Sequence, residues 1–338
     1  MDLLYGERLF AVGKLAVAGA SGRKDEYHTY AGLLAGNGGD AASLFKSALG
    51  ETQGAQLGQA WTLGNNYAVD YLVAGVTHDR AKAAAAMAIL TTQSVPSMAH
   101  VLAGALPMSL ENATQLAADQ VTATKLVIDD AISGSASAFY TDLRAGYVSA
   151  TEAGDTIAKA IVSSLPDAFP GGASDATASF RVELDTLVQE YAYLLTMATR
   201  AVLSGGASGR TAVKVVLGSA ALAIAQRIGA SLGPTAGAEA QSIWAGLSGS
   251  LLAYAVGPDD SARQTAVNAL SYTSAPQLNA FVHEQSNLTV DVQPVIAAAL
   301  QAIDDQRNKS YGTAGRDDRQ WAVLMAGLGD HITGATPA

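Results

Sequence analysis

The chain carries one of its own segments twice, and this internal repeat constrains its fold more than any other feature. The segment LGETQGAQLGQAW at 49–61 returns as LGPTAGAEAQSIW at 232–244, with Leu, Gly, Thr, Gly, Ala and Trp in register. Trp61 and Trp244 are thus 183 positions apart. This spacing exceeds the roughly 20 to 50 residues of a solenoid repeat. The sequence therefore predicts two like domains in tandem.

Two further blocks repeat in the same order at slightly shorter spacings. A middle block with Leu90, Ser94 and Pro96 recurs 180 positions later, and a last block at 128–157 recurs without a gap 175 positions later. Polar residues recur in the last block together with apolar ones, which an alanine-rich composition alone does not explain. The repeat unit therefore covers nearly the whole chain.

The densest turn signal of the chain lies between the two copies. It is the segment PDAFPGGASD at 166–175, where Pro ends a helix and Gly frees the backbone for a linker. We therefore expect one helical-bundle repeat at 1–172 and a second at 173–338. The length of 338 residues agrees with two domains of roughly 100 to 200 residues each.

The composition favours helices built from small residues. Apolar residues make up 49% of the chain, charged residues 15% and aromatic residues 6%, so the core must consist of Ala, Leu, Val and Ile. Ala is the best helix former, and the run RAKAAAAMAIL at 80–90 is typical of a helix. We predict an all-α protein of two antiparallel helical bundles with short connections and closely approaching backbones.

The apolar spacing and the caps divide each half into helices. We expect them at 2–18, 26–34, 40–48, 52–75, 79–104, 109–133 and 138–164, and then at 178–204, 210–229, 236–256, 260–284, 289–307 and 316–334. Asp79 and Ser109 are the predicted N-caps. The Gly-rich segments 36–40 and 205–210 are predicted to be turns, since a phosphate-binding loop has to follow a strand.

Charge and cysteine content exclude several classes of function. The net charge of −10 and the lack of a dense Lys and Arg cluster argue against nucleic acid as a partner. The chain has no Cys, which excludes disulfides, thiolate metal sites and cysteine nucleophiles. The first residues lack the pattern of a signal peptide, and no run of about 18 apolar residues occurs, so we expect no transmembrane segment.

The repeat resembles a family of poorly characterised bacterial helical proteins, common in spore-forming and related soil bacteria. Residues 54–72 resemble one helix of that family, and AGDTI at 153–157 resembles its last helix. The family's histidines fall at Gly64, near Leu247 and near Gln120 here, so any function of those histidines is missing. The resemblance implies a protein at the cell surface or outside the cell, and it implies no activity.

Acidic residues that recur between the copies are the candidates for a ligand site. Asp142 and Asp155 recur as Asp317 and Asp330, and an apolar residue two positions after Asp155 and after Asp330 predicts that these two carboxylates turn inward. A buried carboxylate has to be paired or has to shift its pKa. We favour interhelical salt bridges that fix the register of the helices, and a ligand site stays the alternative.

Other acidic and histidine residues give weaker signals. The adjacent pairs 129–130 and 304–305 are predicted to be solvated helix ends, because neighbouring residues on a helix point in different directions. A di-iron bundle requires a Glu-x-x-His motif, which the sequence lacks, and its five His do not recur between the copies. No Gly-x-Ser-x-Gly motif occurs either. We therefore expect no cofactor, and the sequence assigns no metal.

Aromatic residues mark one face of the same helix in each copy. Trp61 and Tyr71 recur as Trp244 and Tyr254. Large aromatic residues at helical spacing usually fill the interior of a bundle, so we favour a role as core anchors. A ligand pocket between the helices, lined by Trp61 and Trp244, stays the alternative.

These observations favour a binding or structural protein without catalytic machinery, which acts on a protein or cell-surface partner. The first alternative is an enzyme or a carrier that holds a metal or a small ligand inside each bundle, near the recurring Asp residues. The second is a subunit of an assembly, in which the two copies mimic a homodimer.

Overall fold

The computed structural model describes residues 1–169, 176–204 and 206–334. These residues form helices joined by turns and contain no strand, which confirms the all-α class. The chain divides into two compact units, Met1–Asp175 and Ala176–Ala338. The predicted boundary between residues 172 and 173 lies outside the described residues.

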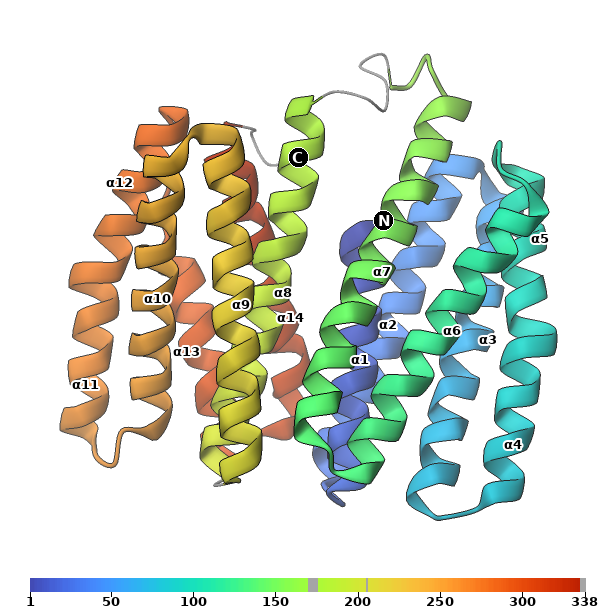
Figure 1. Ribbon diagram of the computed structural model, residues 1–338, viewed down its shortest axis with the longest axis horizontal. Coiled ribbons are helices and arrows are strands. Elements are labelled where there is room, and N and C mark those ends of the chain that lie inside the picture. The colour runs from blue at the N-terminus through green and yellow to red at the C-terminus, as the bar shows by residue number, and fades with distance from the viewer. Residues whose placement is uncertain (170–175, 205, 335–338) are drawn as a thin grey trace. The chain divides into compact units, whose positions relative to one another are not determined.

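The first unit is a bundle whose consecutive helices pack against one another (Figure 1). Its elements are α1 (Asp2–Ala20), α2 (Lys24–Leu49), α3 (Glu51–Val76), α4 (Arg80–Ile89), the π-helix η1 (Leu90–Ser94), α5 (Val95–Ala105), α6 (Leu110–Ser133) and α7 (Ala136–Ser164). The predicted segments 52–75, 79–104, 109–133 and 138–164 match these helices closely.

The second unit shows the same order of elements. They are α8 (Ala176–Ser204), α9 (Ala207–Leu232), α10 (Pro234–Val256), α11 (Asp260–Ala269), the π-helix η2 (Leu270–Ser274), α12 (Ala275–Ser286), α13 (Gln293–Asn308) and α14 (Tyr311–Ile332). The two π-helices lie 180 positions apart, as the middle sequence block does. The duplication itself stays a prediction from the sequence.

The first helix of each unit is buried on nearly all sides. Residues 5–16 of α1 are all buried, and so are most residues between Asp185 and Thr199 of α8. Within the first unit, α1 contacts α2, α3, α6 and α7. A helix that is surrounded in this way is expected to be apolar all round, but α1 also carries the buried charged residues Glu7, Arg8 and Lys14.

Glycines let neighbouring helices approach closely, as the composition predicts. A Cβ added at Gly54 of α3 would lie next to the backbone nitrogen of Lys46 in α2, and one added at Gly237 of α10 would lie 2.8 Å from the carbonyl oxygen of Ala225 in α9. Gly54 and Gly237 are paired by the 183-residue spacing. Both contacts exclude a larger residue.

A π-helical turn precedes the recurring proline in each unit. Pro96 has no N–H and its ring crowds the carbonyl four residues earlier, which is Thr92 in η1. The wider π-helical turn relieves this conflict within one continuous helix. Ser94, the last residue of η1, is buried.

The predicted turn at 36–40 is wrong, because these residues lie inside α2. Gly38 packs near Trp61 and Asn65 of α3, and this packing overrides the weak helix propensity of Gly. In the other Gly-rich segment, residues 207–210 begin α9 instead of forming a turn, and Gly205 lies outside the described residues. The predicted caps are confirmed, since Asp79 and Ser109 accept bonds from the backbone N–H groups of Lys82 and Asn112.

One helix in the described part of the chain, α9, is long and apolar enough to cross a membrane. About a third of its most apolar stretch is buried. A single helix of this kind is weak evidence for a membrane span, because core helices of other proteins meet the same criteria.

Candidate functional site

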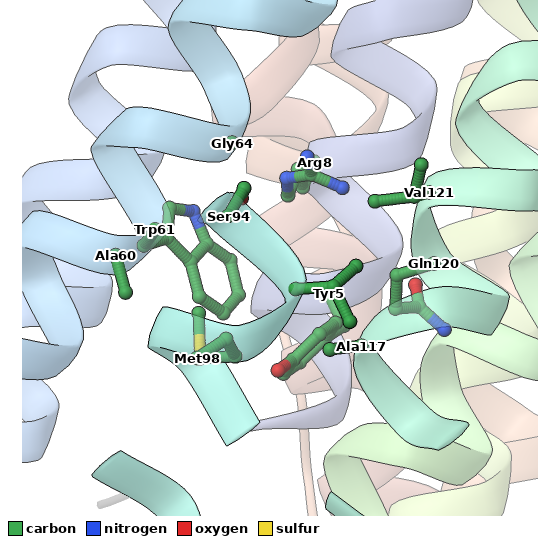
Figure 2. Close-up of a pocket in the computed structure, with 11 residues that line it drawn as sticks. Tyr5, Arg8, Ala60, Trp61, Gly64, Ser94, Met98, Ala117, Gln120 and Val121 are labelled. Atoms are coloured by element: carbon green, nitrogen blue, oxygen red, sulfur yellow. The ribbon is translucent and has the colours of Figure 1, made fainter. Parts of the chain in front are cut away.

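A cavity of about 40 Å³ lies inside the first unit, between α1, α3, α5 and α6. Figure 2 shows the side chains around it, with the Arg8 guanidinium on one side and the Trp61 indole on another. About 10 to 15 Å³ suffices for one water molecule, so the space holds more than one. The lining residues are Tyr5, Arg8, Ala60, Trp61, Gly64, Ser94, Val95, Met98, Ala117, Gln120 and Val121.

Arg8 brings a positive charge to the wall of this cavity. It is 8% exposed, its Nε donates a hydrogen bond to Asn65 Oδ1 at 2.6 Å, and its Nη1 donates a long one to Thr124 Oγ1 at 3.4 Å. A guanidinium has five N–H donors, so three of them remain. Among the residues that the structure describes, no carboxylate forms an ion pair with Arg8 and none bonds to Nη2.

A chain of buried hydrogen bonds fixes Asn65 and, through it, Arg8. Asn65 Nδ2 donates to the carbonyl oxygen of Leu34 at 3.2 Å. Next to it, Trp61 Nε1 donates to Asn37 Oδ1 at 3.1 Å, and Asn37 Nδ2 donates to Glu7 Oε1 at 3.0 Å. The Trp61 ring also lies under the guanidinium, 6.0 Å from its central carbon. The network holds the guanidinium plane against α3.

Ser94 adds a second polar group without a partner. Its side chain is 6% exposed, and its hydroxyl forms no hydrogen bond with any described residue. A Cβ added at Gly64 would lie 3.1 Å from Ser94 Oγ and 3.6 Å from Arg8 Nη2. The hydroxyl and the guanidinium therefore face the same small space, and only a glycine at position 64 leaves that space open.

The rest of the wall is mostly apolar. Trp61, Met98, Ala117 and Val121 face the cavity, and the ring of Tyr5 packs edge-on against Trp61 at 4.6 Å between centroids. Tyr5, through its hydroxyl, and Gln120 are the other polar residues in the lining, and Gln120 Nε2 donates to the carbonyl oxygen of Ser149 at 3.2 Å.

The positive charge of Arg8 has no opposite charge in the lining of the cavity. Burial lowers the pKa of the Arg8 guanidinium from its ordinary value, but an arginine stays charged in proteins. Burying a charge without an opposite charge costs several kcal/mol. An anion in the cavity would supply both the missing charge and acceptors for the three remaining N–H groups.

The second unit closes the corresponding space with other side chains. Tyr191 lies 183 positions after Arg8, the spacing of the first sequence block, and its hydroxyl bonds to the carbonyl oxygen of Trp244 at 3.1 Å and to Ser248 Oγ at 2.6 Å. Leu247 stands where the first unit has Gly64, and Val295 where it has Gln120. The cavity that remains there measures about 10 Å³, so the two units are not equivalent as binding sites.

The predicted aromatic anchors are buried in both units. Trp61 is 2% exposed and Trp244 is 1% exposed. Trp61 is a core residue and a wall of the cavity at once. Tyr71 and Tyr254 lie nearer the surface and donate hydrogen bonds to Asp129 and Asp304 at 2.7 and 2.8 Å.

The four predicted aspartates lie outside the cavity, and each faces another carboxylate. Asp142 lies close to Asp130, and Asp317 lies close to Asp305. Burial and then Asp142 raise the pKa of Asp130. Burial also raises the pKa of Asp305, although a hydrogen bond from Thr313 opposes this.

The second set of carboxylate pairs lies at the other end of α7 and of α14. Asp155 is close to Asp2, and Asp330 is close to Asp185. Burial, with the Asp155 charge as a further cause, raises the pKa of Asp2 to about 6 despite the neighbouring amino terminus. Asp142 and Asp155 are thirteen residues apart in one helix, about 20 Å at 1.5 Å per residue, so they do not form one site.

Only one of the predicted aspartates forms the expected interhelical ion pair. Asp330 of α14 lies 3.6 Å from Arg181 of α8, whereas Asp155 pairs with Lys159 of its own helix at 2.6 Å and Asp317 pairs with the adjacent Arg316 at 2.8 Å.

The prediction of solvated helix ends at 304–305 is wrong for Asp305. This residue is 4% exposed, because the start of α14 covers the end of α13. Its carboxylate accepts hydrogen bonds from Thr313 Oγ1 at 2.6 Å and Gln301 Nε2 at 3.1 Å. In the described residues, no group of three or more His, Asp or Glu side chains converges in a way that could hold a metal ion.

Arg8, Ser94 and Gly64 are candidate site residues that the sequence pattern did not predict. Recurrence between the copies indicates other residues, whereas Arg8 and Gly64 differ from the residues 183 positions later. A cation at position 8 where the second copy, 183 positions later, has Tyr191 is the signal that could have indicated the site.

Comparison of the chain with protein-family models, with curated proteins and with solved structures gives no match. The function therefore has to be argued from the site itself.

Proposed function

We propose that the protein is a non-catalytic binding protein and that its first unit holds a small anion in the Arg8 cavity. The observation that carries this proposal is the buried guanidinium of Arg8, which has no carboxylate partner among the described residues. A bound anion would remove the penalty of an uncompensated buried charge. The hydroxyl of Ser94 and the free N–H groups of Arg8 would donate to it.

The lining favours binding over catalysis. It contains no Asp, Glu, His or Lys side chain that could act as a general acid or base. The Ser94 hydroxyl has no base within hydrogen-bond distance in the described part of the chain, so nothing activates it as a nucleophile. The proposal combines two expectations from the sequence, a binding role and a small ligand inside a bundle. It places the ligand at Arg8 and not at the recurring Asp residues.

We assign the second unit a structural role, because Tyr191 and Leu247 fill the space that the first unit leaves open. The proposed location at the cell surface or outside the cell rests on the family resemblance alone.

Thermal unfolding at constant ionic strength tests the proposal. The reference buffer contains HEPES as its only anion, since its sulfonate is attached to a body too large for the cavity. Small sodium salts then replace the sodium HEPES. A ligand at a hundred times its Kd stabilises the unit that binds it by about 2.7 kcal/mol, which corresponds to a rise in Tm of roughly 5 to 10 °C.

Two variants separate this effect from general salt effects. Arg8→Met should abolish the rise in Tm, whereas Tyr191→Phe, at the paired position of the second unit, should retain it. Equal rises in wild type and in Arg8→Met, or no difference between small anions and HEPES in the wild type, would overturn the proposal.

A further inference from the structure

We propose that the anion is a compact monocarboxylate, with its oxygens on Arg8 and Ser94 and a short apolar substituent against Trp61 and Met98. This inference rests on the proposed function and names the ligand class of the same site. It follows from four properties of the cavity: its donors, its charge, its apolar wall and its size.

The free donors match the two oxygens of a carboxylate. Asn65 occupies Nε of Arg8 and Thr124 occupies one N–H of Nη1, which leaves the second N–H of Nη1 and both N–H groups of Nη2. These groups form the end of the guanidinium fork, where a carboxylate binds with both oxygens. Ser94 Oγ lies on the far side of the space next to Gly64 and donates a further hydrogen bond.

The charge of the site fits one negative charge. Arg8 is the only cationic side chain in the lining, so a monoanion gives a neutral buried pair. A dianion such as sulfate would leave one uncompensated negative charge in the interior, which is unfavourable for the same reason as the lone guanidinium.

The opposite wall favours a carbon substituent over a fully polar anion. Trp61, Met98, Ala117 and Val121 offer no hydrogen-bond donor to the cavity, because the Trp61 N–H is bound to Asn37. An inorganic anion would lose its hydration on this side without replacement, whereas a methyl or ethyl group gains from burial.

The volume sets an upper limit on the ligand. An engineered cavity of about 150 Å³ holds benzene, and the Arg8 cavity measures about 40 Å³. At about 10 to 15 Å³ for each water-sized group, the enclosed part takes about three non-hydrogen atoms, which is the carboxylate group itself, so the apolar substituent extends toward the opening. Met98 and Val121 are partly exposed, which places the approach to the site between α5 and α6.

Isothermal titration of the full chain with sodium salts in HEPES buffer tests this ligand class. Formate, acetate, propionate and benzoate are compared with chloride, nitrate and sulfate. We expect acetate or propionate to bind about fourfold or more tightly than formate, the gain of one buried methyl group, and at least tenfold more tightly than chloride. Benzoate and sulfate should give no binding heat.

A glycine variant tests the location without removing the charge. Gly64→Ala places a methyl group between Ser94 Oγ and Arg8 Nη2 and should weaken acetate binding at least tenfold. Gly104→Ala is the matched control, because a Cβ at Gly104 meets no atom within 4 Å, and it should bind acetate like the wild type. Far-UV circular dichroism verifies that both variants are folded.

Each outcome decides between the two proposals. If chloride or nitrate binds as tightly as acetate and Arg8→Met abolishes the binding, the anion site stands and the carboxylate class is wrong. If sulfate binds most tightly, the class is also wrong. If no small anion binds in an Arg8-dependent way, the proposed function fails together with this inference. Acetate binding that Gly64→Ala leaves unchanged would place the ligand elsewhere and overturn the inference.

Discussion

Replacing Asp185 with Asn should make the second unit more stable at alkaline pH. Asp185 is 9% exposed, and a Cβ added at Gly329 of α14 would lie next to its Oδ1. Burial first, and then the charge of Asp330, raise the pKa of Asp185 from 3.8 to about 8, while Arg181 lowers it. The native unit therefore keeps a proton on Asp185 that the unfolded chain loses above about pH 4.

The sign and the size of the effect follow from this difference. The native state binds more protons than the unfolded state between about pH 4 and pH 8, so the stability of the wild type falls as the pH rises through that window. Each pH unit is worth about 1.4 kcal/mol, so the loss reaches about 4 to 5 kcal/mol by pH 8. Asn resembles the protonated carboxyl in shape and does not titrate, so Asp185→Asn should avoid this loss.

Urea unfolding between pH 4 and pH 9 measures the difference. A Trp61→Phe background removes the tryptophan of the first unit, so the fluorescence reports Trp244 and Trp321 of the second. We expect equal stability of the two proteins near pH 4 and an advantage of several kcal/mol for Asp185→Asn at pH 8. Asp260→Asn, which removes an exposed pair with Arg263 in the second unit, is the control and should change stability by less than about 1 kcal/mol. Parallel pH profiles for wild type and Asp185→Asn would refute the reasoning.

Three further substitutions test the packing of the second unit. Gly329→Ala places a methyl group against Asp185 and should lower the free energy of unfolding by about 1 to 3 kcal/mol. Gly327→Ala in the same helix is the control, since its methyl group meets no atom within 4 Å, and it should raise the free energy of unfolding by up to about 1 kcal/mol. Equal effects of the two variants in urea unfolding would contradict the contact between Gly329 and Asp185. Leu247→Ala removes a side chain that is 5% exposed and should lower the free energy of unfolding by about 2 to 5 kcal/mol, and a loss below 1 kcal/mol would show that Leu247 does not fill the core.

The fold class and most helices could be predicted from the sequence, because local signals agree with the tertiary structure there. The Ala-rich run at 80–90 lies in a helix, and Asp79 and Ser109 cap the helices that they were expected to cap. The glycines at 36–39 gave a misleading signal, since their low helix propensity is outweighed by the packing of α2 on α3. The sequence around residues 36–39 does not indicate this packing of α2 on α3.

The recurring aspartates could be found from the sequence, but their surroundings could not. Sequence reasoning expected Asp142, Asp155, Asp317 and Asp330 to face cations across helices, and only Asp330 does so. Each instead lies near a second carboxylate, from α1, α6, α8 or α13. The facing residue depends on how two helices pack, which periodicity within one helix does not specify.

The Arg8 site depends on contacts between four segments that are distant in the sequence. Arg8 lies on α1, Gly64 on α3, Ser94 at the end of η1 and Gln120 on α6. A single Arg in an apolar helix predicts a buried charge only when the whole helix is known to be internal. The burial of α1 on nearly all sides is therefore the structural fact that turns Arg8 into a candidate ligand-binding residue.

A crystal structure of the protein soaked in sodium bromide tests the central claim most directly, because bromide is located by its anomalous scattering. The account predicts an anomalous peak within hydrogen-bond distance of Arg8 Nη2 and Ser94 Oγ, and none beside Tyr191 in the second unit. An Arg8 cavity that contains only water, or an Arg8 side chain paired with a carboxylate of the protein itself, would contradict it.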